Sequence, residues 1–269
     1  MKKIDLSTTH IMGILNLTDN SFYDGNKYNT QEKAINQVRK MIKEGATIID
    51  IGAQSSKPGS EEISEEEEWK RIKDVLKKVR NEFKNILISI DTYRSSVAEK
   101  SINNGADIIN DISSGNLDKN MFTIIAKYQV PYILMHMQNI PKNMQDNPIY
   151  DNVIKEIIEF FNQKINILNN LGVFDLIIDP GFGFGKTLIH NYKKLNNLKK
   201  FQSLNLPILS GCSRKSMIYN LLDCDAESAL NGTTITNTLA LVNGANILRV
   251  HDVKEAVECA KIVNFAQNN

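Results

Sequence analysis

The stretch Gly45-Ala46-Thr47-Ile48-Ile49-Asp50 decides the fold class, because its pattern occurs three times in the chain. Residues 105–110 read GADIIN and residues 244–249 read GANILR. In each copy, a glycine of the kind that ends a helix precedes a short apolar run that finishes in a polar residue. The repeat therefore predicts a joint at which a helix ends and a buried strand begins.

Outward from this joint, short β-branched runs alternate with amphipathic segments along the whole chain. Helices are predicted around 35–42, over 64–83 behind a Ser64…Glu67 capping box, over 151–171 and over 253–266. Strands are predicted at HIMGILN (10–16), TIIDIG (47–52), ILISID (86–91), DIINDI (107–112), PYILMH (131–136), DLIID (175–179), PILSG (207–211) and NILRVH (246–251).

This alternation predicts the architecture. Nearly continuous apolar strands separated by helices indicate a parallel sheet covered by helices. Eight such units in 269 residues predict an α/β fold, a (β/α)8 TIM barrel that forms a single domain over 1–269. A doubly wound open sheet is the alternative, because strand order cannot be read from the sequence.

The composition narrows the class of protein. Lys and Arg (32) nearly balance Asp and Glu (31), so no overall positive charge argues for nucleic acid or an anionic membrane as a partner. The N-terminus, MKKIDLSTTH, lacks an apolar signal segment, and no apolar run is long enough to span a bilayer, so a soluble cytoplasmic protein is expected. Cys212, Cys224 and Cys259 lack the spacing of a metal site and are predicted to be buried as small apolar residues.

The glycine-rich stretch LIIDPGFGFGKT (176–187) ends like a nucleotide-binding P-loop but does not fit that motif. The P-loop pattern requires a glycine where Pro180 stands, and the dinucleotide-binding pattern requires one where Lys186 stands. What remains is a strand that ends in Asp179 and a loop whose Phe184 is suited either to cover an aromatic ring or to anchor the core. Lys186 is interpreted as a solvated lysine that caps the loop, and His136 as a structural residue.

Polar groups follow every predicted strand, where the catalytic groups of a barrel lie. At one position a polar residue that merely ends the strand is an equally good explanation, but eight positions with both acids and cations favour a site. Carboxylates and amides suit the N–H groups of a heterocycle, and cations suit an anionic tail, so the pattern predicts a ligand with two different ends. The residues are Asn16, Gln54 to Lys57, Asp91, Asn110, His136, Asp179, Ser213 to Lys215, Arg249 and His251.

These stretches resemble the signatures of the dihydropteroate synthase family. The first signature is matched by MGILNLT (12–18) with SFYDG (21–25), and the second by SSKPG (55–59). Further matches are IDT (90–92), NDI (110–112), LMHMQ (134–138), DPGFGFGK (179–186), SRKS (213–216) and RVHDV (249–253). They follow the family's order, so the resemblance covers essentially the whole chain.

The resemblance implies an enzyme of folate biosynthesis, a pterinylmethyl transferase that is usually a homodimeric barrel. The family condenses 6-hydroxymethyl-7,8-dihydropterin diphosphate with p-aminobenzoate and releases diphosphate, with Mg²⁺ as cofactor. By this resemblance Asn16 ligates Mg²⁺, Lys215 and Arg249 take part in catalysis, and Asp24 stabilises a cationic intermediate. The pterin would be held by Asp91, Asn110, Asp179 and Lys215, and the diphosphate by Ser56, Arg249 and His251. The p-aminobenzoate would lie nearer the rim, against Phe22, Pro58, Phe184, Ser213 and the stem of Lys215.

Two loops depart from the family's pattern. Asp19 and Asn20 stand where the family usually has Pro and Asp, and Gln54 and Lys57 stand where it has Glu and Arg. Lysine lacks the bidentate fork of arginine, so these changes are expected to affect turnover more than ligand identity. Two other functions stay open, a pterin-binding methyltransferase and a non-catalytic pterin-binding relative. The cations at 215, 249 and 251 argue against both, because neither function requires a site for diphosphate.

Overall fold

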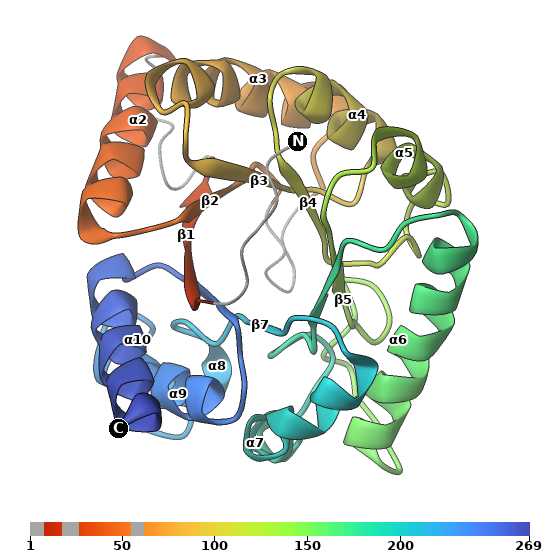
Figure 1. Cartoon of the computed structure of the whole chain (residues 1–269), viewed down its shortest axis with the longest axis vertical. Helices are drawn as coiled ribbons and strands as arrows, with labels where there is room; N and C mark the ends of the chain where they lie inside the picture. Colours follow the sequence, from red (N-terminus) through yellow and green to blue (C-terminus); the bar gives the residue numbers. More distant parts are fainter. Residues whose placement is uncertain (1–7, 18–26, 55–61) are drawn as a thin grey trace.

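The computed structural model describes residues 8–17, 27–54 and 62–269, and shows a ring of strands enclosed by helices (Figure 1). The strands are β1 (His10–Asn16), β2 (Ile48–Gly52), β3 (Leu87–Asp91), β4 (Ile108–Asp111), β5 (Tyr132–Met135), β6 (Leu176–Asp179), β7 (Leu209–Ser210) and β8 (Ile247–Val250). The helices are α2 (Lys27–Glu44), α3 (Glu65–Glu82), α4 (Ser95–Asn103), α5 (Met121–Tyr128), α6 (Val153–Asn170), α7 (Leu188–Asn196), η1 (Leu198–Leu204), α8 (Ser216–Tyr219), α9 (Leu230–Val242) and α10 (Val253–Asn268).

The eight strands form one parallel sheet that closes on itself. Their order is β6-β5-β4-β3-β2-β1-β8-β7. The ring closes between β6 and the segment that enters β7, where Ile178 pairs with Ile208 and its N–H donates to the Pro207 carbonyl at 2.9 Å. The predicted (β/α)8 barrel is therefore confirmed, and the open doubly wound sheet is wrong.

The three repeated joints have the predicted geometry. Gly45, Gly105 and Gly244 have φ angles of +107°, +100° and +92°, which residues with a side chain rarely adopt. The N–H of the alanine that follows each glycine returns to a carbonyl of the preceding helix at 2.9 to 3.0 Å, as in a Schellman motif. Each helix thus stops and the chain enters β2, β4 or β8.

The helix predicted behind Ser64 is confirmed as α3, but only half of its capping box forms. The Ser64 hydroxyl accepts from the Glu67 N–H at 3.2 Å. The Glu67 carboxylate instead binds Arg71 at 2.9 Å and Lys70 at 3.1 Å. A complete capping box begins α7, where Thr187 and His190 bind each other's backbone N–H groups.

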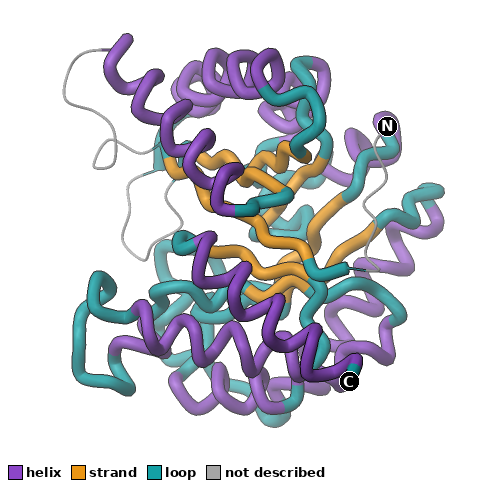
Figure 2. Tube along the Cα trace, turned by 60° about the vertical axis from the view of Figure 1, so that its left-hand side comes forward, coloured by secondary structure: helices purple, strands orange, loops and turns teal. Residues whose placement is uncertain are grey.

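The inside of the barrel is closed by an apolar floor, a cluster with one buried residue from each strand. Figure 2 shows the strands in the interior with helices outside them. Because side chains alternate along a strand, the residue two positions after each floor residue also points inward, towards the carboxyl ends of the strands. The floor consists of Met12, Ile48, Leu87, Ile108, Ile133, Ile177, Leu209 and Ile247.

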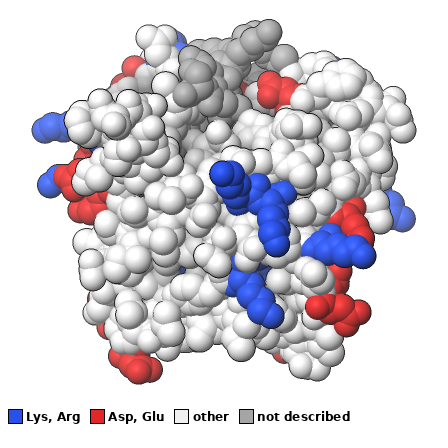
Figure 3. Space-filling model, turned by 60° about the horizontal axis from the view of Figure 1, so that its bottom comes forward, with Lys and Arg blue, Asp and Glu red and all other residues white. Residues whose placement is uncertain are grey.

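Other expectations concern the cysteines and the surface. Cys212 and Cys259 are buried as predicted, whereas Cys224 is half-buried because it lies in the loop after α8, so that part of the prediction is wrong. Within the described ranges, no helix combines the length and apolarity that crossing a membrane requires. On the face seen in Figure 3, most of the surface carries no charge and the basic side chains gather near its middle, so positive charge is local there.

Candidate active site

A cavity at the carboxyl ends of the strands brings the predicted pterin residues together. Asn110, Asp179 and Arg249 each lie two positions beyond a floor residue, so strand alternation alone points them into the barrel. Asp91 ends β3, and Lys215 follows β7 at the start of α8. The cavity is lined by Asp91, Asn110, Ile112, Met135, Asp179, Phe184, Gly211, Lys215 and Arg249.

The last residues of the three repeated joints meet beneath this cavity. Arg249 Nε donates to Asp50 Oδ2 at 2.6 Å, and Asn110 Nδ2 donates to the same oxygen at 3.1 Å. A second bond runs from Arg249 Nη2 to Asp91 Oδ2 at 2.7 Å. Asp50 is fully buried and was not predicted as a site residue. Its position in the repeat, equivalent to those of Asn110 and Arg249, is the sequence signal that could have identified it.

These contacts set the charges at the site. Burial lowers the pKa of Arg249, but the carboxylates of Asp50 and Asp91 outweigh burial, so its pKa is raised and the guanidinium stays charged. Burial raises the pKa of Asp91, and Arg249 opposes that shift. One cation thus binds two carboxylates, and the cluster is preorganised before any ligand enters.

A second cation lies across the cavity. Lys215 Nζ donates to the Phe182 carbonyl at 2.5 Å and lies 4.7 Å from the centre of the Phe184 ring. Burial lowers the pKa of Lys215 to about 8, although Asp179 raises it. The amine is therefore mostly protonated at neutral pH, but it titrates much closer to neutrality than an exposed lysine.

Two backbone features leave room between the charged groups. Asp179 Oδ1 accepts from the Gly181 N–H at 2.7 Å, which orients the carboxylate at the end of β6. A Cβ atom built on Gly211 would lie 3.8 to 3.9 Å from Lys215 Nζ, Arg249 Cβ and Asp179 Oδ2. Gly211 thus lies among three charged residues, where any side chain would occupy the space that a ligand needs.

The remaining predicted residues within the described ranges lie outside the cavity lining. Ser213 Oγ and His251 Nδ1 are 3.0 Å apart, and the His251 N–H donates to Ser213 Oγ at 3.2 Å. Asn16 ends β1 with an exposed side chain, in register with Gly52 of β2, which is in turn in register with Asp91. Gln54 Oε1 accepts from the Ile63 N–H at 2.9 Å. Outside the described residues lie Asp19, Asn20, Phe22, Asp24, Ser56, Lys57 and Pro58.

One interpretation of the glycine-rich loop is wrong. Lys186 is not solvated, because its side chain turns into the protein and the residue is only 3% exposed. Its Nζ donates to His136 Nδ1 and to the His136 carbonyl at 2.9 Å each, and to the Phe184 carbonyl at 2.8 Å. His136 is itself buried, which agrees with the structural role assigned to it.

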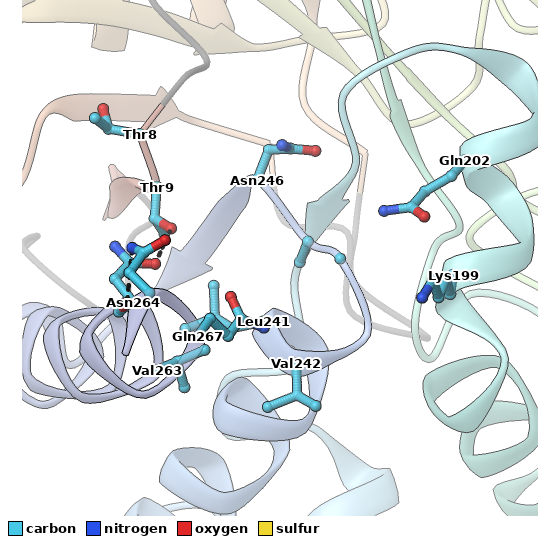
Figure 4. A pocket seen from close by; sticks show the side chains of 13 residues that line it. Thr8, Thr9, Lys199, Gln202, Leu241, Val242, Asn246, Val263, Asn264 and Gln267 are labelled. Carbon is cyan, nitrogen blue, oxygen red and sulfur yellow. Dashed lines mark hydrogen bonds between the residues drawn. The ribbon is translucent and has the colours of Figure 1, made fainter.

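A separate hollow of about 480 Å³ lies at the opposite end of the barrel, where β1 and β8 begin (Figure 4). Thr8, Thr9 and Asn246 lie on one side of it, with Lys199 and Gln202 facing them. The described residues that line it include no carboxylate and no histidine. Lys199 is the one charged residue in this described lining, which lacks the paired acceptors and cations of the first cavity, so the hollow is not the candidate active site.

Comparisons with known proteins agree with this geometry. The family model described as "Pterin binding enzyme" matches residues 12–251. The dihydropteroate synthase of Escherichia coli (strain K12) is 44% identical over 262 residues, which is 97% of this chain and 92% of the relative.

Solved structures show the same relationship. The crystal structure of Yersinia pestis dihydropteroate synthase with a sulfonamide drug has a TM-score of 0.93 at 41% identity, covering 99% of this chain and 97% of the other. A Xanthomonas albilineans dihydropteroate synthase with 4-aminobenzoic acid has a TM-score of 0.91 at 33% identity, covering 98% of this chain and 95% of the other. Sequence and fold agree over almost the whole length, and the chain belongs to the dihydropteroate synthase family of pterin-binding enzymes.

Proposed function

We propose that this protein is a dihydropteroate synthase that condenses 6-hydroxymethyl-7,8-dihydropterin diphosphate with p-aminobenzoate in tetrahydrofolate biosynthesis. The observation that carries the proposal is the single cavity lined by Asp91, Asn110, Asp179, Lys215 and Arg249. Its acceptors and cations match the two ends of this substrate. The names of the relatives support the synthase over the methyltransferase alternative.

The pterin ring fits the buried side of the cavity. Carboxyl oxygens accept hydrogen bonds, so Asp179 and Asp91 suit the amino and ring N–H groups. The Asn110 amide supplies both a donor and an acceptor, and Lys215 donates to ring acceptors. Ile112 and Met135 supply apolar surface for the faces of the ring.

The cations suit the diphosphate. Arg249 stays charged through Asp50 and Asp91, so it can offset negative charge that develops on the departing group. His251 and Ser56 are the further diphosphate contacts that the resemblance implies. Lys215 lines the same cavity and supplies a second positive charge for the diphosphate.

Mg²⁺ fits this site as a companion of the diphosphate. The parts of the chain that the structure describes contain no cluster of three or more His, Cys, Asp or Glu residues able to hold a metal. Asn16 offers one exposed amide oxygen on the rim. Mg²⁺ usually keeps several waters and is bound by few protein oxygens together with substrate phosphates, so Asn16 would supply one ligand and the diphosphate others. When bound, the ion would neutralise charge on the diphosphate.

The proposed reaction is dissociative. Diphosphate leaves first, the methylene-pterin carries positive charge, and the arylamine of p-aminobenzoate attacks it. Phe184 and Ser213, with Phe22 and Pro58, would form the p-aminobenzoate site, and Asp24 would stabilise the cation. Water must be kept away from that cation, because it would otherwise give the hydrolysed pterin.

We also propose a cytoplasmic homodimer. Helix α9 exposes Ile235, Leu239 and Val242 at intervals of four and three residues, which places them on one face. The adjoining α10 exposes Ile262 and Phe265. Exposed apolar residues on two neighbouring helices support association with a second copy. Light scattering should give twice the chain mass, and Leu239→Glu should give monomers; a wild-type monomer would refute the dimer.

Product formation by the purified protein tests the main proposal. The protein is incubated with pterin diphosphate, p-aminobenzoate and Mg²⁺, and dihydropteroate and diphosphate are quantified by chromatography. Equal amounts of both products are expected, and excess EDTA should abolish their formation until Mg²⁺ is restored. Binding of the pterin diphosphate without product release would instead support the non-catalytic relative, and activity unchanged in EDTA would refute the role of Mg²⁺.

A further inference from the structure

Lysine side chains hold the backbone of the loop between β6 and α7, one from the loop itself and two from α7 and the segment after β7. Gly181, Gly183 and Gly185 have φ angles of +68°, +83° and +64°, so the backbone turns at every second residue. Three lysines bind alternate carbonyls, with Lys194 on Pro180 at 3.0 Å, Lys215 on Phe182 at 2.5 Å and Lys186 on Phe184 at 2.8 Å. Lys215 belongs to the cavity, whereas the other two lysines have no place in the proposed reaction.

Lys186 connects this loop to another strand. Besides the Phe184 carbonyl, its Nζ binds both the ring and the carbonyl of His136, which follows β5. The packing around this link is tight, because a Cβ atom on Gly181 would lie 2.0 Å from the His136 oxygen and 3.2 Å from Lys186 Nζ. The end of β5 and the backbone of Phe184 are thereby joined through one amine.

The residue held in this way forms one wall of the cavity. Phe184 lines the cavity, and its ring lies 4.7 Å from Lys215 Nζ. A movement of the Phe184 backbone would displace its ring, which is both an apolar wall of the cavity and the aromatic neighbour of the Lys215 amine. Displacements of about 1 Å at such a site are enough to change rates by an order of magnitude or more.

Lys194 offers a matched comparison on the same loop. It is fully buried, binds the Pro180 carbonyl and lies 4.3 Å from the centre of the Phe182 ring. Phe182 is also fully buried and does not line the cavity. Burial lowers the pKa of both Lys186 and Lys194 well below that of an exposed lysine. Burying an apolar side chain of similar length would cost less free energy than burying an amine. Each amine is therefore expected to contribute through the carbonyl groups to which it donates.

We propose that Lys186 is a positioning residue for p-aminobenzoate, which places the Phe184 ring by fixing the Phe184 carbonyl against His136. This role rests on the proposed synthase function, because it assigns the Phe184 wall to the arylamine substrate. Lys194 is the structural counterpart, which holds the same loop at Pro180 without contact to the cavity.

The test compares Lys186→Met with Lys194→Met, each of which removes one buried amine from the loop. In Lys186→Met, the KM for p-aminobenzoate should rise about tenfold while the KM for pterin diphosphate changes less than about threefold. In Lys194→Met, both constants should stay within about twofold of the wild type. An unchanged p-aminobenzoate KM in Lys186→Met, or an equal rise in Lys194→Met, would overturn the proposal.

A double-mutant cycle adds a readout that general loosening of the fold would not produce. If Lys186 acts through Phe184, the variant with both Lys186→Met and Phe184→Leu should have the same p-aminobenzoate KM as Phe184→Leu alone. Additive increases would overturn the proposal, because they would show that the two residues act independently.

Two further controls separate the positioning role of Lys186 from a role in folding and from the proposed synthase function itself. If Lys186→Met fails to fold, Lys186→Gln, which retains a hydrogen-bond donor, replaces it in the same measurements. If neither variant folds, Lys186 is required for folding and the positioning role is overturned. Wild-type protein that forms no product would refute the proposed function, and this role with it. Product formation with unchanged constants in the variant would refute the positioning role alone.

Discussion

Two inward-facing layers of the barrel lie two residues apart and have opposite chemistry. In the floor, Ile108, Ile177 and Ile247 are fully buried against their counterparts from the other strands. The next inward residues on the same strands are Asn110, Asp179 and Arg249. Two residues of a strand span only about 6.6 Å, so the apolar floor and the polar layer lie almost in contact.

The comparison shows how one barrel separates stability from function. The floor has no polar group to satisfy, so its energy comes from burial and close packing. The layer above keeps several charges in a largely buried space, and Asp50 Oδ1 has no partner among the described atoms. Buried charges of this kind lower the stability of the fold locally. They are useful at a binding site because they are already in place when a charged or polar ligand arrives.

Removing Lys215, the cation that lies beside the upper layer at the start of α8, is expected to have the largest effect. Lys215→Ala should lower kcat/KM about 10³-fold, since it deletes a charge at the reacting centre. The melting temperature should change little, because loss of the bond to the Phe182 carbonyl is offset by removal of a buried charge that opposes the folded state below about pH 8. Turnover within threefold of the wild type would contradict the assignment.

A change in the floor should give the reverse result. Ile177→Ala should reduce the free energy of unfolding by about 3 kcal/mol, because it leaves a cavity in a packed layer. Urea denaturation measures this loss of stability. The kcat at 15 °C should stay within about twofold of the wild-type value, since Asp179 keeps its place two residues further along β6. If activity fell as far as in Lys215→Ala, the two layers would not be separate in function.

Asp50 allows a smaller test of how the upper layer is preorganised. Asp50→Asn keeps the shape but removes the negative charge that binds Arg249, so kcat/KM should fall about tenfold. The control is Ser89→Ala, since Ser89 is in register with Asp50 on the next strand and its hydroxyl has no partner in the described structure. That control should be nearly neutral, and an equal loss in both variants would assign the effect to packing.

The pH dependence should show the smallest effect. With a pKa of about 8, Lys215 is charged below that pH and loses its proton above it. If the charged amine is needed, kcat/KM should fall about fourfold between pH 7 and pH 8.5. Lys215→Arg should remove this decline, because arginine stays protonated throughout the range. A decline that persists in Lys215→Arg would assign the titration to another group.

Much of the fold could be predicted because its signals are local. The glycine joints and apolar runs located every strand within one or two residues, although β7 retains only Leu209 and Ser210 of the predicted run 207–211. Polar residues at the strand ends were also predictable as site residues, since parallel strands must present their carboxyl ends on one side.

The errors concern contacts between distant segments. Lys186 was interpreted as solvated, because the sequence does not show that the loop turns its side chain towards His136. Asp50 was overlooked, because a buried carboxylate in a strand acquires its role only when Arg249 and Asn110 lie beside it. Both cases depend on residues 50 or more positions apart in the chain.

The succession of strands and helices, the joints between them and the polar residues at the strand ends can all be read from the amino-acid sequence. These follow from conformational preference and side-chain alternation, which act over a few residues. Three features become visible only in the folded chain: the sheet closes between β6 and β7, Asp50 and Asp91 share Arg249, and three lysines hold one loop. Burial and charge pairing depend on distances between segments, and those distances exist only once the barrel has closed.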